Sequence, residues 1–296
     1  MESSESDPPV LVSVADPRHV EQLVRTGGDI ALARGVPVRI VSVVAKPASS
    51  PFAVFDDETI IQEFSGNRQE LLDRATSVAP ADVPVEGEVI VGRSVSDAVL
   101  RAIGTHGASA LVVGWIERQR RNAVLGTTVD RLIAGAACDL YVERIGSEAN
   151  AVNSVLLPVA GGPHLPTAAA GAKAIASRNE AEVVVLSVAT AESDLAEANT
   201  FVEEGVKAVL AAPGGSVSIS QKTDIGSDTV GVIAKAAAEH DVAVLGATRQ
   251  GRLRRRLVGS IPRALVSQSN TTVILARNGN TVPGPMLQRV LGIVRD

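Results

Sequence analysis

The stretch from Gly246 to Ile261 (GATRQGRLRRRLVGSI) combines glycines, five arginines and a closing Gly-Ser pair, which are residue types that hold phosphate groups. A glycine loop that leads into a helix offers unpaired backbone N–H groups and the positive end of the helix dipole to an anion. The Ser260 hydroxyl and nearby arginines would add hydrogen bonds, each charged one contributing about 1.5–3 kcal/mol. The stretch therefore predicts an anion-binding loop, with a solvated basic edge or a nucleic-acid patch as the alternatives.

The charge and hydropathy of the chain weigh against nucleic acid and membrane as partners. The net charge is -5 at pH 7, which gives no whole-molecule attraction to a polyanion. The first ten residues are acidic and polar, and no run of 18 or more apolar residues follows. We therefore expect a soluble, cytoplasmic protein without direct membrane insertion.

Residues that could perform catalysis or bind a metal show no recognised pattern. The histidines have no metal-ligand spacing, no Walker lysine follows a glycine loop, and there is no GxGxxG. Cys138 is the only cysteine, which excludes an internal disulfide, and we expect it to be a buried thiol on a strand. We expect a non-enzymatic protein without a metal, and leave slow ATP hydrolysis open. The four histidines, expected at the surface or at helix ends, are His19, His106, His164 and His240.

The elements that would position the arginine-rich loop are present twice. An apolar run that ends in Val-Ala begins both copies, and the two occurrences lie 145 positions apart. The first copy carries about a dozen extra residues in Ala45–Glu58. The matched pairs are 10–19 with 155–164, 38–44 with 183–189, 96–114 with 227–246, and 126–144 with 259–277.

Each copy alternates apolar strand patterns with helical patterns, and has five strands. Such alternation implies crossover connections and hence an α/β fold with a mainly parallel sheet and helices on both faces. We place the first domain at 1–147, the second at 153–277 and a C-terminal tail at 278–296. The strands DLYVER (139–144) and TVILAR (272–277) could pair within the chain, which would make the two domains an intramolecular pseudo-dimer; further homodimerisation is left open.

Ligands of open parallel sheets bind beyond the carboxyl ends of the strands, where the strand order reverses. In the second copy this places the turn after Leu156–Val159 beside the turn after Val242–Gly246. The latter turn is the arginine-rich loop. We therefore expect the ligand of the second copy in the crevice between these turns.

The tandem halves, the Val-Leu-Gly strand end, the glycine-spaced loop and the Gly-Ser pair resemble the universal stress protein family. The resemblance covers almost the whole chain and implies two Rossmann-like domains of the adenine nucleotide alpha hydrolase-like type. Members that bind ATP carry Gly, two residues, Gly, nine residues, Gly, then Ser or Thr. The resemblance thus implies that the anion is an adenine nucleotide, ATP.

The second copy keeps most of this motif. Gly246, Gly259 and Ser260 stand at the family's spacing, whereas Arg249 replaces the middle glycine. Ala160 stands where ATP-binding members usually have an aspartate. By resemblance, the nucleotide-binding residues are Pro158, Val159, Ala160, Gly161, Val188, Leu245, Gly246, Arg249, Gly251, Gly259, Ser260 and Ile261.

The first copy departs further from the motif. Glu117 stands at the middle glycine, where a carboxylate would repel phosphate, and the loop is one residue short. Ala15 occupies the aspartate position, and Asp16 follows it. By resemblance, this weaker site would comprise Val14, Ala15, Val43, Gly114, Gly126 and Thr127.

The sequence leaves two functions open. The first is a non-catalytic stress-response regulator with ATP bound mainly in the second copy. Losing one charged hydrogen bond weakens binding roughly ten- to hundredfold, so the departures from the motif bear directly on this function. The alternative is a nucleotide-independent interaction module that binds a protein partner, with a membrane transporter as one candidate.

Overall fold

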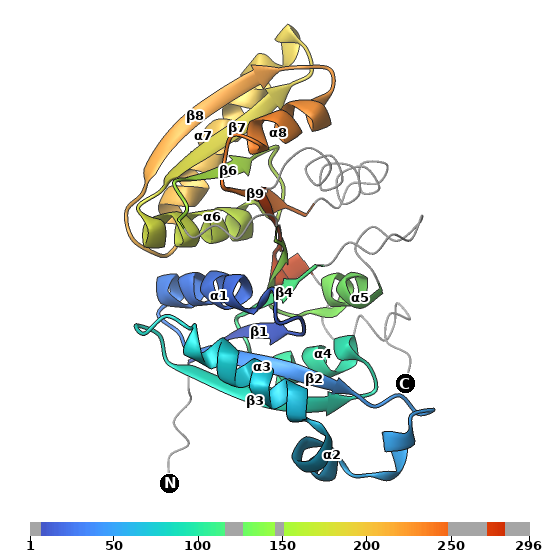
Figure 1. Ribbon diagram of the computed structural model, residues 1–296. Helices are drawn as coiled ribbons and strands as arrows, with labels where there is room; N and C mark the ends of the chain where they lie inside the picture. Colours follow the sequence, from blue (N-terminus) through green and yellow to red (C-terminus); the bar gives the residue numbers. More distant parts are fainter. Residues whose placement is uncertain (1–6, 116–126, 146–150, 248–270, 282–296) are drawn as a thin grey trace.

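The computed structural model describes residues 7–115, 127–145, 151–247 and 271–281 (Figure 1). Helices and strands alternate in both halves, as expected from the two repeats. The first half contains β1 (Val10–Val14), α1 (Val20–Arg34), β2 (Val38–Ala45), η1 (Pro51–Val54), α2 (Asp57–Phe64), α3 (Gly66–Ser77), β3 (Val85–Gly92), α4 (Val95–His106), β4 (Ala110–Gly114), α5 (Thr127–Gly135) and β5 (Asp139–Arg144). The second contains β6 (Ser154–Pro158), α6 (Leu165–Asn179), β7 (Glu182–Ala189), η2 (Glu192–Asp194), α7 (Leu195–Ala211), β8 (Ser218–Ile225), α8 (Thr229–Ala237), β9 (Val242–Gly246), β10 (Thr272–Arg277) and η3 (Gly279–Thr281).

The two halves share one ten-stranded sheet with the order β3-β2-β1-β4-β5-β10-β9-β6-β7-β8. All strand pairs within a half are parallel. The join between the halves is antiparallel, and β5 and β10 pair in a register in which Leu275 lies opposite Val142. The α/β class, the five strands per half and the pairing of these two strands within one chain are thereby confirmed.

Helices cover both faces of this sheet in two hydrophobic layers. Residues of α1, α3, α6 and α7 pack on one face, and residues of α4, α5 and α8 pack on the other. The central strands β4 and β9 are buried on both faces, as their continuous apolar sequences require. Helix α1 of the first half and α6 of the second lie side by side over the join (Figure 1).

Side-chain caps set where several of the helices begin. Ser94 accepts a hydrogen bond from the Asp97 N–H at 3.2 Å at the start of α4. Asp228 accepts one from the Gly231 N–H at 3.1 Å at the start of α8. Each cap satisfies one of the N–H groups that the first helical turn leaves unpaired.

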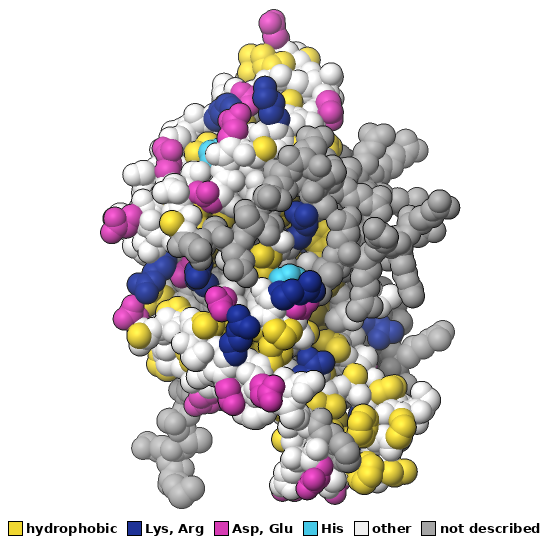
Figure 2. Space-filling view, in the orientation of Figure 1, with side chains coloured by type: hydrophobic (Ala, Val, Ile, Leu, Met, Phe, Trp, Pro, Cys, Tyr) yellow, Lys and Arg dark blue, Asp and Glu magenta, His cyan; other side chains and the backbone are white. Residues whose placement is uncertain are grey.

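The extra residues of the first copy form η1 and lead into α2, a helix that is absent between β7 and β8 of the second half. Hydrophobic side chains gather on the surface over these two elements, at the lower right of Figure 2. Val54 is 85% exposed and Phe55 is 39% exposed. The insertion therefore adds an apolar surface that the second copy does not share.

Candidate functional site

The sheet topology brings together the turns on which the ligand site was predicted. In the first half β1 lies between β2 and β4, and in the second half β6 lies between β7 and β9. Because neighbouring strands here are parallel, their carboxyl ends meet at one edge of the sheet, and the strand order reverses at β1 and β6. The topology therefore predicts one ligand crevice per half.

In the second half, most described residues of the predicted set lie at this edge. Pro158 ends β6, Gly246 ends β9, and Val188 lies near the end of β7. Leu245 is buried, and so is Val159, whose N–H donates to the Leu186 carbonyl at 2.8 Å. Ala160 is exposed and Gly161 follows it. The structure thus places these residues at or near the ends of the adjacent strands β9, β6 and β7 or in the turn after β6, and their role in binding a ligand stays a prediction.

The Gly-Gly turn after β6 requires its glycines. Gly161 and Gly162 have φ values of 70° and 96°, a left-handed region that other residues rarely adopt. A β-carbon on Gly161 would also come within 3.0 Å of the Phe201 ring, and it would lie 3.8 Å from Oε2 of Glu204. Glu204, on α7, therefore brings a carboxylate to the turn in which Ala160 replaces the family's aspartate. No pattern in the sequence indicates this approach.

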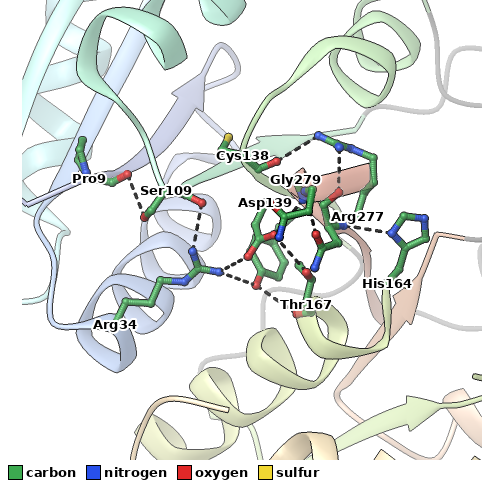
Figure 3. A network of polar contacts seen from close by, with 12 residues as sticks. Pro9, Arg34, Ser109, Cys138, Asp139, His164, Thr167, Arg277 and Gly279 are labelled. Carbon is green, nitrogen blue, oxygen red and sulfur yellow. Dashed lines mark hydrogen bonds and ion pairs between the residues drawn. The ribbon is translucent and has the colours of Figure 1, made fainter. Parts of the chain in front are cut away.

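His164 lies beside Gly246, the last residue of β9. It stands at the start of α6, is only 4% exposed, and accepts a hydrogen bond from the Asn278 N–H on its Nδ1 at 3.1 Å (Figure 3). A β-carbon on Gly246 would lie 3.4 Å from the His164 β-carbon. His164 is thus a helix-end residue, as predicted, and it ties the residue after β10 to the start of α6.

The rest of the predicted phosphate loop lies outside the described residues. This holds for Arg249, Gly251, Gly259, Ser260 and Ile261 in the second copy and for Gly126 in the first. Their assignment to a nucleotide site stays a prediction.

The first half contains a hollow of about 530 Å³ at the carboxyl end of β2. Of the described residues predicted for this copy, only Val43 lines it. Val14 and Gly114 end the neighbouring strands, Ala15 follows β1, and Thr127 begins α5. The hollow is lined by Val43, Val44, Ala45, Glu63, Ser65, Gly66, Asn67 and Arg68.

The polar wall of this hollow comes from the end of α2 and the start of α3. The Arg68 guanidinium donates to the Ala15 carbonyl at 3.2 Å, which ties α3 to the turn after β1. Sequence reasoning missed these residues, because they lie in the helical segment that follows the insertion. The sequence offered one indication of them. They follow the second strand of a parallel sheet, and the carboxyl end of that strand borders the expected ligand crevice.

Asp16, one position after Ala15, is engaged by Arg18. Its carboxylate accepts hydrogen bonds from the Arg18 backbone N–H at 3.0 Å and from the guanidinium at 2.7 and 3.0 Å. Hydrogen bonds from the Arg18 side chain, followed by the one from its backbone, lower the pKa of Asp16 to about 2. Asp16 therefore shapes the turn by its bonds to Arg18.

The described residues contain no group of three or more His, Cys, Asp or Glu side chains arranged to hold a metal ion. Among the same residues, no helix is both long and apolar enough to cross a membrane. The chemistry that the two crevices offer comes from backbone groups, apolar strand ends and a few charged side chains.

Comparison with solved structures shows the same fold in other proteins. The chain is 14% identical to a universal stress protein from Archaeoglobus fulgidus DSM 4304, with a TM-score of 0.61 and coverage of 93% of this chain and 98% of that one. It is 12% identical to a functionally unknown protein from Pseudomonas aeruginosa PAO1, with a TM-score of 0.58 and coverage of 99% and 100%. It is also 12% identical to the cytoplasmic domain of a prokaryotic cation chloride cotransporter, with a TM-score of 0.56 and coverage of 95% and 99%. A comparison with curated proteins gave no significant match.

The family of the chain follows from its sequence repeats and from a family model. The Universal stress protein family model matches twice, at residues 8–144 and 152–277. The two matches contain the two parallel halves of the sheet. The chain belongs to the universal stress protein family and carries the family's unit twice in tandem.

Proposed function

We propose that this protein is a non-catalytic stress-response regulator that binds an adenine nucleotide at the carboxyl edge of its sheet. The observation that carries the proposal is the hollow of about 530 Å³ at the end of β2, next to the reversal of strand order. Its volume lies in the usual range for small-molecule sites, and apolar strand ends face polar side chains across it. Among the described lining residues, Arg68 is a positive group that could hold a phosphate, and Glu63 is a negative one.

The second crevice is the other candidate position for the nucleotide. Support for it comes from Gly246 at the end of β9, from the glycine turn after β6, and from the Gly259-Ser260 pair in the sequence. Glu204 could replace the missing aspartate at Ala160 in holding a ribose hydroxyl. The proposal covers both crevices, and the experiment separates them.

Calorimetric titration of the full chain with ATP tests the proposal. A dissociation constant between micromolar and millimolar is expected. Replacement Gly66→Leu places a side chain at the hollow, where a β-carbon meets nothing within 4 Å, so the fold should tolerate it. We expect this change to weaken ATP binding at least tenfold.

Two further variants complete this test. Gly104→Leu is the matched control, because Gly104 is also helical and open around its β-carbon but lies on α4, away from both crevices. Gly259→Trp tests the second crevice. Loss of binding in Gly259→Trp alone would assign the nucleotide to the second half, and no heat of binding with millimolar ATP in the unaltered chain would reject the nucleotide.

The apolar surface of the insertion favours a second candidate function, a protein-interaction module. Val54 is 85% exposed, and exposed apolar patches commonly mark binding sites. The cytoplasmic domain of a cotransporter shares this fold, and for that reason a transporter is one partner to test. If the module is the function, Val54→Asp should abolish binding to the purified partner, whereas Gly66→Leu should leave it intact.

A further inference from the structure

Four polar side chains are buried where the first half meets the second. Gln22, Thr26 and Asp29 stand on one face of α1, at spacings of four and three residues, and Glu143 comes from β5. Asp29 is 4% exposed and Glu143 is 0% exposed. We call these four residues the seam cluster, because α1 packs here beside α6 of the second half.

The seam cluster has more acceptors than donors. Both carboxyl oxygens of Glu143, Oδ1 of Asp29 and Oε1 of Gln22 are buried and make no hydrogen bond within the part of the chain that the structure describes. Thr26 and Gln22 lie near enough to the Glu143 carboxyl to influence its charge, but neither contact has hydrogen-bond geometry. A protonated carboxyl would supply the missing donor, since its O–H can bond to a neighbouring oxygen. The buried oxygens of the cluster therefore lack hydrogen-bond donors, and protonation of a carboxyl would supply one.

The charged groups around the cluster do not supply the hydrogen bonds that these buried oxygens lack. Helix α1 contributes Arg25, and α6 contributes Arg178, which also pairs with Asp82 at 3.2 Å. Arg144 follows Glu143 on β5, and the strands on either side place Gly114 and Ile274 opposite Glu143. Burial outweighs the nearby arginines and raises the pKa of Glu143 and of Asp29 to about 7.

The corresponding place in the second half is largely apolar. By the offsets of the repeat, Asp29 corresponds to Ala174 on α6, and Glu143 corresponds to Ala276 on β10. Both alanines are buried. The second half therefore packs α6 on β10 without carboxyl groups at these positions. Because the fold does not need them, the two carboxyls between α1 and β5 call for an explanation other than stability.

We infer that the seam cluster is a proton-sensitive contact between the two halves, in which protonation of the buried Glu143 and Asp29 carboxyls holds α1 against β5 and α6. Loss of these protons to water leaves two buried negative charges. Because both charges are more stable in contact with water, the packing of α1 on α6 loosens. The strand pairing of β5 with β10 persists, so the halves stay joined while the helices open. The pH of the solvent would then influence how the two halves are positioned relative to one another.

Carbon-13 NMR of the full chain with labelled side-chain carboxyls tests the protonation. We expect one Glu carboxyl resonance to titrate near neutral pH, to vanish in Glu143→Gln, and to remain in Glu197→Gln, the same change at an exposed position of α7. A Glu143 resonance that titrates in the ordinary range of a glutamate would overturn the inference.

Amide hydrogen exchange tests the loosening. At about pH 8 the amides of α1 and α6 should exchange at least tenfold faster in the unaltered chain than in Glu143→Gln, whereas at about pH 5 the two should match. Comparison at one pH cancels the intrinsic exchange rate, and α4, on the opposite face, serves as the internal control. Equal exchange rates of the α1 amides in both chains at both pH values would refute the proposed proton sensitivity of this contact. If Glu143→Gln does not fold, Asp29→Asn replaces it in the exchange experiment. The NMR experiment then follows the aspartate carboxyls, of which one should titrate near neutral pH and vanish in Asp29→Asn.

Discussion

Gly171 of the second half lies directly against the ring of Tyr141 of the first half. A β-carbon at position 171 would come within 2.7 Å of Cε1 of that ring. The Tyr141 side chain is fully buried, and its hydroxyl donates to the Thr167 carbonyl at 3.1 Å (Figure 3). The glycine of α6 is therefore what lets an aromatic ring of β5 fill the contact between the halves.

Replacement Gly171→Ala should destabilise the protein because the added methyl group overlaps this ring. We expect a loss of about 1–3 kcal/mol in the free energy of unfolding, measured with urea. Gly104→Ala is the control, since a β-carbon there meets nothing within 4 Å and alanine favours a helix by about 0.5–1 kcal/mol. Equal stability of Gly171→Ala and the unaltered chain would show that Tyr141 can move aside.

Arg34 connects α1 with β5 at the same join. Its guanidinium bonds to Asp139 at 2.6 Å and to the Ser109 carbonyl at 3.1 Å, and Asp139 in turn accepts a hydrogen bond from Thr167 of the second half at 3.1 Å (Figure 3). The Arg34 and Asp139 side chains are 17% and 23% exposed. The ion pair is thus largely shielded from water.

Replacement Arg34→Met should cost about 2–3 kcal/mol of unfolding free energy, because it leaves a shielded carboxylate without its cation. Arg39→Met is a matched control, since Arg39 pairs with a Glu86 side chain that is 70% exposed. Such exposed pairs contribute about 0–1 kcal/mol. Thermal melts of both variants check the prediction, and a larger loss in Arg39→Met than in Arg34→Met would contradict it.

The sequence predicted the strands and their connections well because their signal is local. Runs such as ALVVG and VAVLG are buried on both faces and form β4 and β9 as expected. The duplication then made the pairing of β5 with β10 readable, since two equivalent edge strands on one chain lie at high effective concentration.

The site was less predictable, because its walls come from elements far apart in the chain. The α3 side chains that line the first hollow, and the approach of Glu204 to Gly161, depend on how helices pack on the sheet. Nothing in the sequence pattern around Arg68 or Glu204 predicts how these helices pack on the sheet. The seam cluster was missed for the same reason, since Asp29 alone reads as an ordinary polar residue of α1.

Cys138 should resist thiol reagents in the folded protein. The thiol is 5% exposed and lies just before β5, and burial raises its pKa to about 12, so almost no thiolate forms at neutral pH. We expect labelling with a disulfide reagent to be at least a hundredfold slower in buffer than in denaturant, where one thiol per chain should react. Rapid labelling of the native protein would show that the segment before β5 opens readily.

Replacement Asp29→Asn should flatten the pH dependence of stability. The pKa of Asp29 is about 7 in the folded protein, chiefly through burial, and near 3.8 when unfolded, so the folded state binds more protons in between. The contribution of this group to stability is therefore complete below about pH 4 and is lost as the pH rises through 7. At pH 8 the variant should be more stable than the unaltered chain, by on the order of 2 kcal/mol, and near pH 4 the difference should disappear. Urea unfolding across this range measures it; a variant that is less stable at pH 8 would mean that Asp29 acts as a paired carboxylate, held charged by Arg25 and Arg178.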